Sequence, residues 1–507
     1  MAKNNLQFFQ EPRLTFGYGQ CHESPKDGLF LYGPLDAAPM QVLRVGAVGT
    51  PDGLRRLRDW LHHARGIIPA KDDPSPQHLM FPGFGAVFGA DLPLTPAVEI
   101  NIQESRLREA IFDADRHQGM FATVDLFSNE IVRHQHESDA SIDIWFVVIP
   151  EYVYTYGRPL SKIPSAERVA VERPIDKKLA AKLNVSPSLF PEDNEASVPY
   201  QYELNFHNQL KARLLERGST VVQVVRETTI APNDFSRKDG RPTRGTQDAA
   251  TLAWNLSVAT YYKFGKRPWK LEHIREGVCY IGLVFKRLND AADSNLACCG
   301  AQLFLSSGDG VVFRGAVGPW MSPETRQFHL SREAARDLAS MVLEAYQRSH
   351  GKPPAEVFIH GLTHFNDEEW AGFTEAAPQG TSIVGVQIRE GREFKLFRPG
   401  SRPVLRGTAF VQYDRGGYLW TRGYIPYLQT YMGREAPNPL RINLLRGEAD
   451  LSTVMQDIMG LTKLNFNSCT YADGLPVTLR FANMVGEILT AGPKHDRTAP
   501  LPFKHYI

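Results

Sequence analysis

The sequence has no run of the roughly 18 apolar residues that a transmembrane helix needs, so no membrane span is expected. Its opening residues, MAKNNLQFFQEPRL, contain neither an apolar core nor a small-residue cleavage site, so we expect no secretion signal. It has only five cysteines, none in a CxxC spacing, and two of them, Cys298 and Cys299, are adjacent. This usage is typical of a reducing compartment and argues against a zinc module. We therefore expect a cytoplasmic protein.

Common catalytic signatures and an excess of positive charge are missing as well. There is no GxSxG elbow, no GxxxxGK[ST] phosphate loop and no HExxH motif. The 57 Lys and Arg residues nearly balance the 56 Asp and Glu residues, which leaves a net charge of +1. Simple nucleic-acid-binding domains are usually strongly basic, so such a function here requires positive charge gathered in one channel.

The 507 residues are enough for roughly two to four domains with sizeable cores. Helical patterns alternate with apolar runs such as IDIWFVVIPE, which is typical of a strand buried on both faces of a parallel sheet. We therefore predict an α/β protein. The segment Tyr156–Tyr200, rich in Pro, Ser and charge, is predicted to be a loop within the first α/β unit.

Most of the candidate binding residues lie in one stretch of the sequence, from Leu204 to Trp269. Helical spacing is predicted over 201–217, and His207 and Lys211, four residues apart, share one face of that helix. The run TVVQVV predicts a short buried strand at 219–225, whose only polar interruption is Gln223.

A second helix, predicted at 250–264, would bring Lys263 to the same end of this β-α unit. A terminal phosphate carries about two negative charges and needs several donors. Lysines supply cations, glutamine supplies a neutral donor, and a histidine ring offers a face on which a base can stack.

This order and spacing resemble the guide 5′-end pocket in the MID domain of Argonaute proteins. The resemblance implies that His207, Lys211, Gln223 and Lys263 bind the 5′ phosphate of a guide. The chain departs from the family in two ways. Histidine stands at the first position, where many Argonautes have tyrosine, and Ala259 stands where some have a further basic residue.

A second stretch, Leu461–Leu489, is similar to the last part of an Argonaute PIWI domain, which is RNase H-like. Here we predict a helix reaching Leu464, a polar turn, and a long helix that starts at Pro476. The sequence ends LPFKHYI. The resemblance implies that the carboxylate of Ile507 reaches the MID pocket and helps to hold Mg²⁺ against the guide phosphate.

The resemblance divides the chain into three parts. Residues 1–105 form an N-terminal segment leading into MID, 106–270 a Rossmann-like MID domain, and 271–507 an RNase H-like PIWI domain. In the last part, we predict an antiparallel meander from YIGLVFKRL, AQLFLSS and VVFRGAVG, followed by an amphipathic helix that Ser331 caps and Gly351 ends.

Cleavage by an RNase H-like site needs several carboxylates to hold two divalent cations. By alignment with slicing Argonautes, Val284 occupies the first metal-ligand position and Asn483 the last, while Gly361 and Leu362 occupy the region of the second. An apolar valine cannot bind Mg²⁺, so we expect no slicing activity. The alternative is a site rebuilt by nearby carboxylates, for which the candidates are Asp367, Glu368 and Glu369.

The length and domain content resemble a short prokaryotic Argonaute. This implies a subunit that binds a small 5′-phosphorylated guide RNA and complementary single-stranded target DNA without cutting. Such proteins work as heterodimers with an APAZ-containing partner, whose TIR or sirtuin-like domain degrades NAD or whose nuclease attacks nucleic acid, in abortive defence against plasmids or phage. A higher oligomer can form on activation. Two alternatives remain: a guide-directed nuclease and an unrelated α/β binding protein.

Overall fold

The computed structural model describes most of the chain. The parts outside the description are 1–4, 38–40, 72–75, 140, 170–174, 219, 238–239, 241, 274, 288–296, 305–309, 323, 432 and 494–499. The first residue of the strand predicted at 219–225 and the end of the strand predicted from AQLFLSS therefore lie outside it. No helix in the described part is long and apolar enough to cross a membrane.

The first half of the chain is built on a parallel four-stranded sheet with the order β5-β4-β6-β7. Its strands are β4 (Val45–Gly49), β5 (Val98–Asn101), β6 (Ile144–Ile149) and β7 (Val222–Arg226). All six residues of β6 are buried, which explains the continuous apolar run in its sequence. Because β4 and β5 precede residue 106, the sheet of the predicted MID domain begins within the predicted N-terminal segment.

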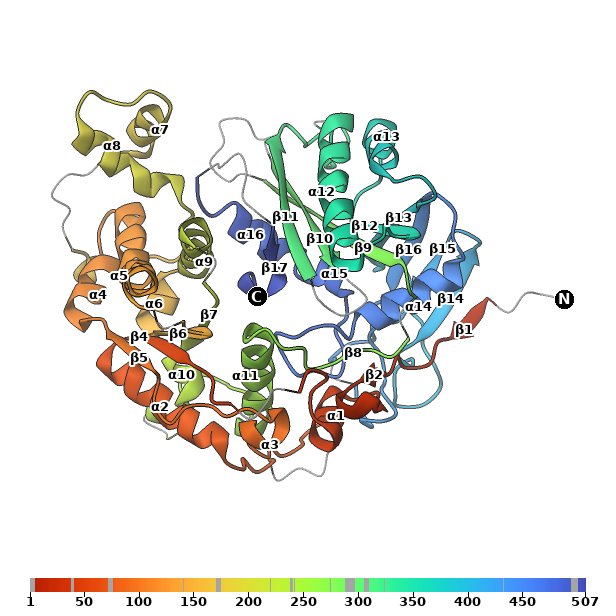
Figure 1. Ribbon diagram of the computed structural model, residues 1–507, viewed down its shortest axis with the longest axis horizontal. Helices are drawn as coiled ribbons and strands as arrows, with labels where there is room; N and C mark the ends of the chain where they lie inside the picture. Colours follow the sequence, from red (N-terminus) through yellow and green to blue (C-terminus); the bar gives the residue numbers. More distant parts are fainter. Residues whose placement is uncertain are drawn as a thin grey trace.

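Helices surround this sheet and lie to the left and below in Figure 1. They are α1 (Pro25–Tyr32), α2 (Pro51–Arg65), α3 (Phe84–Phe88), α4 (Glu104–Ile111), α5 (Arg116–Glu137), α6 (Glu151–Tyr156), α7 (Lys177–Val185), α8 (Pro191–Ser197), α9 (Phe206–Arg217), α10 (Glu227–Ile230) and α11 (Ala249–Lys263). The loop predicted at Tyr156–Tyr200 is thus partly helical, since α7 and α8 lie in it. They project from the rest of this half (Figure 1).

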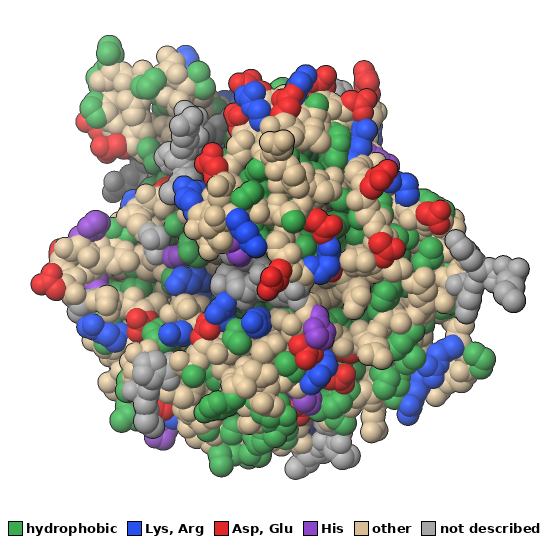
Figure 2. All heavy atoms as spheres, turned by 45° about the vertical axis from the view of Figure 1, so that its right-hand side comes forward, with side chains coloured by type: hydrophobic (Ala, Val, Ile, Leu, Met, Phe, Trp, Pro, Cys, Tyr) green, Lys and Arg blue, Asp and Glu red, His purple; other side chains and the backbone are tan. Residues whose placement is uncertain are grey.

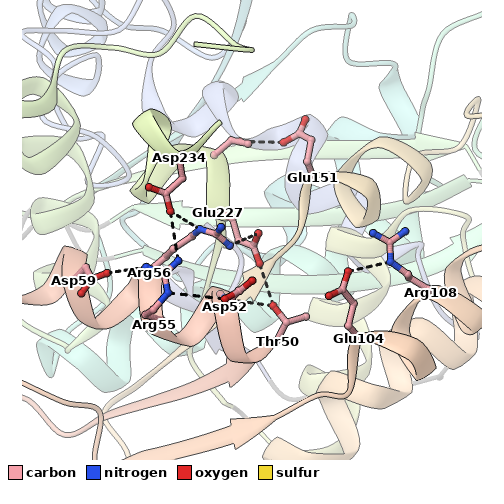
Figure 3. A network of polar contacts seen from close by, with 12 residues as sticks. Thr50, Asp52, Arg55, Arg56, Asp59, Glu104, Arg108, Glu151, Glu227 and Asp234 are labelled. Atoms are coloured by element: carbon pink, nitrogen blue, oxygen red, sulfur yellow. Dashed lines mark hydrogen bonds and ion pairs between the residues drawn. The ribbon is translucent and has the colours of Figure 1, made fainter. Parts of the chain in front are cut away.

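A polar network holds α2 at the carboxyl ends of the parallel strands (Figure 3). Thr50 caps α2 by accepting a hydrogen bond from the Gly53 backbone, and its hydroxyl donates to Glu227 at 3.1 Å. Arg56, one turn into α2, donates to Glu227 at 3.1 Å and to Asp234 at 2.9 Å. The buried Glu227 carboxylate therefore has partners for both oxygens, as a buried charge requires.

The second half contains a mixed ten-stranded sheet with the order β1-β14-β15-β16-β13-β12-β9-β10-β11-β17. Its strands are β1 (Leu6–Phe8), β9 (Val278–Arg287), β10 (Ala297–Phe304), β11 (Gly310–Gly318), β12 (Glu356–Gly361), β13 (Ser382–Glu390), β14 (Thr408–Tyr413), β15 (Gly416–Leu419), β16 (Leu440–Arg446) and β17 (Leu501–Pro502). The antiparallel order β9-β10-β11 and the helix after it confirm the predicted meander.

The helices of this half are α12 (Arg332–His350), α13 (Asp367–Ala376), α14 (Leu451–Leu461), α15 (Val477–Arg480) and α16 (Ala482–Leu489). As predicted, Ser331 caps α12 through the Ala334 backbone, and Gly351 ends it with a φ of 72°. The long helix predicted from Pro476 is wrong. It is divided into α15 and α16 at Phe481, which has a φ of −104° and a ψ of 1°.

The N-terminal residues also bind the second half through a buried ionic cluster. Glu11 accepts hydrogen bonds from Arg406 at 2.8 and 3.1 Å, and Lys463 lies 2.7 Å from the same carboxylate. Burial alone would raise the pKa of Glu11, but Arg406 and Lys463 outweigh it and hold that pKa below its usual range. A strand pair, β2 (Leu14–Thr15) with β8 (Lys270–Leu271), reinforces the connection.

We expect Glu11→Gln to lower the free energy of unfolding by about 3 to 5 kcal/mol, because two buried cations would lose their counter-ion. The pKa of Glu11 is lower in the folded state, so its contribution is present above the ordinary carboxyl pKa and is lost as the pH falls through the folded-state value. Urea unfolding at pH 7 and pH 4 measures both effects. The control is Arg392→Gln, which removes an exposed ion pair with Glu390 and should change stability by less than about 1 kcal/mol. Equal effects of the two variants would contradict this account.

Candidate nucleic-acid interface

Lys211, on α9, is the centre of the predicted phosphate pocket. Its side chain is 2% exposed, and its Nζ donates hydrogen bonds to the backbone oxygens of Tyr506 at 3.0 Å and Ile507 at 2.7 Å. The helix begins at Phe206, where Asn205 caps it, and ends at Gly218, which has a φ of 145°. The structure thus brings Ile507, the last residue of the sequence, to the helix that carries Lys211, as the resemblance implies.

Lys263 approaches the same place from the last turn of α11. Its Nζ donates to the side-chain oxygen of Gln223 at 2.6 Å and to the Val222 backbone oxygen at 3.1 Å, both at the start of β7. Lys263 is also 2% exposed. The polar interruption in the strand is therefore explained, because Gln223 is the partner of a buried lysine.

The two lysines of this pocket have lowered pKa values. Burial lowers the pKa of Lys211 to about 7. Burial, with the nearby charge of Lys211, lowers the pKa of Lys263 well below its ordinary value. Within the described residues, no Asp or Glu side chain forms an ion pair with either lysine. The pocket therefore holds cationic groups whose charged forms have no acidic side chain to stabilise them.

His207 lies one turn before Lys211 and is half-buried. Burial, with the charge of Lys211, lowers its pKa to about 3, so the ring is neutral at physiological pH. Its Nδ1 lies 3.3 Å from the side-chain oxygen of Asn208. A neutral ring can stack on a base without adding charge, as the resemblance implies for this position.

Sequence reasoning missed the residues just before Ile507. His505 and Tyr506 are buried, and burial, with the charges of Lys504, Lys211 and Lys263, lowers the pKa of His505 to about 4. Lys504 lies beside the loop that follows α11, where its Nζ is 3.3 Å from the position that a Cβ on Gly265 would take. No local pattern distinguishes these residues from an ordinary chain end, which is usually poorly ordered.

At the predicted metal positions of the PIWI half, the structure shows packing. Val284 on β9 is 3% exposed, and a Cβ added to Gly486 on α16 would lie 3.1 Å from its Cγ1. Helix α16 therefore lies directly on Val284. Leu362, after β12, is 50% exposed, and Asn483 is exposed at the start of α16.

Two of the three carboxylates that could rebuild such a site have other partners. Asp367 pairs with Arg446, and Glu368 is exposed. Glu369 is 1% exposed and accepts a hydrogen bond from the Leu330 backbone at 3.2 Å. Among the residues that the structure describes, no group of three or more His, Cys, Asp or Glu is placed to hold a metal ion.

The surface charges are mixed on the face shown in Figure 2, where Lys and Arg side chains lie among Asp and Glu. This face therefore carries no large surface made only of basic side chains. The positive charge relevant to the candidate site is local and buried, in the pocket around Lys211 and Lys263.

We expect Val284→Asp to lower the free energy of unfolding by about 2 to 5 kcal/mol, because it places a carboxylate under α16 without a partner. The matched control is Val284→Asn, which has the same shape without the charge and should be less destabilising above pH 6. Thermal unfolding with and without Mg²⁺ measures the effect. A rise in Tm with Mg²⁺ in the aspartate variant alone would show that this position can still bind a metal.

No protein-family model matches the sequence, and no curated protein matches it. Solved Argonaute structures do match its fold. A Clostridium butyricum Argonaute bound to a guide DNA and a 19-mer target DNA has a TM-score of 0.61 at 13% identity, over 97% of this chain and 54% of that one. Aa-Ago with externally bound siRNA has a TM-score of 0.56 at 14% identity, over 100% and 56%. The A. aeolicus Argonaute has a TM-score of 0.53 at 13% identity, over 99% and 54%.

The chain thus spans just over half the length of these Argonautes. Its parallel four-stranded sheet and its mixed ten-stranded sheet agree with the predicted Rossmann-like and RNase H-like units. The fold class predicted from the sequence is confirmed: this chain has the fold of an Argonaute protein, with a MID part followed by a PIWI part.

Proposed function

We propose that this protein binds a small 5′-phosphorylated guide RNA and uses it to capture complementary single-stranded DNA. The observation that carries the proposal is the pair of buried lysines, Lys211 and Lys263, with lowered pKa values and no Asp or Glu side chain paired to them in the described structure. Gln223 and His207 complete a set of donors and a stacking face around them. The C. butyricum Argonaute with the same fold holds a guide and a target, which supports the assignment.

A phosphate suits this pocket because it brings negative charge to two buried lysines that have no Asp or Glu side chain paired with them in the described structure. A bound dianion would stabilise the charged forms of both lysines and raise their pKa values. The hydrogen bonds that Lys211 now donates to Tyr506 and Ile507 would be shared with, or replaced by, phosphate oxygens. Base pairing along the guide would then read the sequence, while protein contacts to the backbone hold it.

The residues present fit the Mg²⁺ that the resemblance implies at the guide 5′ end. Mg²⁺ is usually bound by one or two carboxylates together with substrate phosphates and water. The resemblance assigns one ligand to a carboxylate of Ile507, whose oxygen lies 2.7 Å from the Nζ of Lys211, and the guide would supply the phosphate oxygens. When bound, the ion would neutralise phosphate charge beside the buried lysines.

The proposal includes binding without cleavage. Its support is Val284, which is apolar and covered by α16, together with the partners of Asp367 and Glu369. We propose further that target binding activates a separate APAZ-containing effector subunit, in defence against plasmids or phage. The activity of this effector is most directly measured as NAD hydrolysis. The support for the partner is the resemblance to short prokaryotic Argonautes.

Guide loading is tested by purifying the protein from its host cells and labelling the nucleic acid that co-purifies. We expect short RNAs that accept a 5′ label only after phosphatase treatment, and their loss in the double variant Lys211→Ala/Lys263→Ala. The matched control is Lys178→Ala/Lys182→Ala, which removes two exposed lysines from α7 and should leave the RNA in place. If no small nucleic acid co-purifies with the wild-type protein, the proposal is wrong.

The lowered pKa of Lys211 also predicts how guide affinity changes with pH. Because the free lysine has a pKa of about 7 and the phosphate-bound lysine a higher one, binding above pH 7 takes up a proton. Affinity should fall by up to about tenfold for each pH unit above 7, and should also fall below about pH 6 as the phosphate protonates. Fluorescence anisotropy with 5′-phosphate and 5′-hydroxyl versions of one RNA measures this. The same pH profile for both RNAs would contradict the assignment.

A further inference from the structure

The loop between β13 and β14 is strongly basic, and the proposed function does not yet use it. Residues 389–406 contain six Lys or Arg and two Glu, whereas the other 51 basic and 54 acidic residues of the chain leave a net charge of −3. The structure describes 324–431 and 433–493 without a gap, so the charges of this loop and of the strands beside it are all placed. Residues 391–402 are called the basic loop below.

Two apolar side chains hold the basic loop against the sheet. The ring centroid of Phe394 lies 5.0 Å from that of Tyr418 on β15. Leu396 packs against the same hydrophobic cluster. The side chains that alternate with these two, Lys395 and Phe397, are exposed, and Phe397 is 74% exposed. The basic loop therefore holds an aromatic ring in the solvent on an anchored backbone.

Both carboxylates of this stretch already have cationic partners. Glu390 pairs with Arg392 at 2.9 Å, and Glu393 pairs with Arg441, on β16, at 3.4 Å. The remaining cations of the basic loop therefore have no carboxylate of the loop left to pair with.

Two of these cations flank Phe397. The Nζ of Lys395 donates one hydrogen bond, to the backbone oxygen of Ala436 at 3.2 Å, and has two further protons to donate. Arg398 is exposed. Among the described residues, no Asp or Glu forms an ion pair with either cation, and this includes Glu435 beside Ala436. The exposed ring thus has an available cation on each side.

The basic loop leaves the sheet at the edge that carries the predicted metal positions. Strands β9, β12 and β13 lie side by side and are parallel, so their carboxyl ends share that edge (Figure 1). Arg389, near the end of β13, donates to the backbone oxygen of Leu362, directly after β12, at 2.7 Å. A nucleic acid strand that follows this edge would therefore meet the basic loop.

An aromatic ring between two cations suits a single-stranded nucleic acid. Surfaces that bind single strands combine cations that contact phosphates with rings on which unpaired bases stack. An acidic protein surface would need the cations but not the ring. Exposed cations are screened by salt, so the ring supplies the part of the affinity that salt does not remove.

We propose that Phe397 stacks on an unpaired base of a nucleic acid strand and that Lys395 and Arg398 bind the phosphates beside that base. The identity of the strand, guide or target, rests on the proposed function. Binding of a single strand by the basic loop does not, because the guide pocket is a separate site.

The test measures the affinity of the full-length protein for an oligothymidylate with a 5′ hydroxyl, by fluorescence anisotropy. The wild type and the Lys211→Ala/Lys263→Ala variant should bind it equally, since it has no 5′ phosphate for the guide pocket. Phe397→Ala and Phe397→Leu should each weaken binding roughly five- to a hundredfold, because neither side chain can stack on a base. Phe397→Trp, which keeps the ring, should bind at least as well as the wild type.

The salt dependence separates the role of the ring from that of the cations. Lys395→Gln/Arg398→Gln should reduce the slope of log Kd against log salt by about 1.4, the value for two lost phosphate contacts on a single strand. Phe397→Ala should leave that slope unchanged, because it removes no charge.

Matched controls remove similar groups elsewhere. Tyr18→Ala removes a ring that is 96% exposed, and Lys178→Gln/Lys182→Gln removes two exposed cations from α7. Both should bind the oligothymidylate as the wild type does. An unchanged Tm shows that each variant is folded.

Two results overturn the proposal: no binding of the oligothymidylate by the wild type, or wild-type affinity in Phe397→Ala. If that affinity is unchanged and a co-purifying protein is lost from Lys395→Gln/Arg398→Gln, the basic loop binds an acidic protein instead.

Guide-loaded wild type then distinguishes the two strands. If Phe397→Ala weakens target binding only when the target extends beyond the guide, the bound base belongs to the target. If the effect requires a guide that extends beyond the target, the base belongs to the guide. A wild type that carries no guide contradicts the proposed function, whereas the oligothymidylate result still decides the role of the basic loop.

Discussion

The hydrogen bonds of Lys211 with Tyr506 and Ile507 join the first half of the chain to its last residues, and the arrangement of the candidate site depends on them. They place the end of the PIWI part against a MID helix. A second link lies nearby, where Glu487 on α16 pairs with Lys286 and approaches the side chain of Asn208 on α9. Neither half alone would contain the complete pocket.

A net charge of +1 is compatible with an anion site because burial matters more than the number of basic residues. In water, an exposed lysine is well solvated and gains little from a phosphate. A buried lysine has already lost its water, so a bound anion restores much of the lost stabilisation. Lys211 and Lys263 are both of this kind, whereas most basic side chains on the visible face lie among acidic ones (Figure 2).

Much of the fold could be predicted because local patterns were strong. The buried strand β6, the amphipathic helix α12 and the meander of the second half all follow from periodicity and capping. The break between α15 and α16 could not be predicted, since the residues on both sides of Phe481 are good helix formers. Tertiary packing overrides local propensity, and both helices lie against β9, α16 through Gly486 at Val284 and α15 through Thr478 at Gly282.

The candidate site, too, could be predicted only in part from the sequence. His207 and Lys211 share a helical face, and simple spacing predicts that. The helix pattern also predicts that Lys263 lies at the same end of the β-α unit, although its hydrogen bond with Gln223 could not be predicted. The position of Ile507 joins residues far apart in the sequence, and only the resemblance to a known family suggested it. His505 was missed, because no local pattern distinguishes it from ordinary surface.

The two edge strands of the ten-stranded sheet also affect how the protein folds during its synthesis. One edge strand, β1, comes from the first residues of the chain and pairs with β14, while the other, β17, comes from the last residues and pairs with β11. On the ribosome, β1 has no partner until β14 has been synthesised, and β17 emerges after every other strand of this sheet. Such non-local pairing is slow and leaves strand edges open to other chains. Prematurely terminated chains of this protein should therefore aggregate rather than persist as partly active fragments.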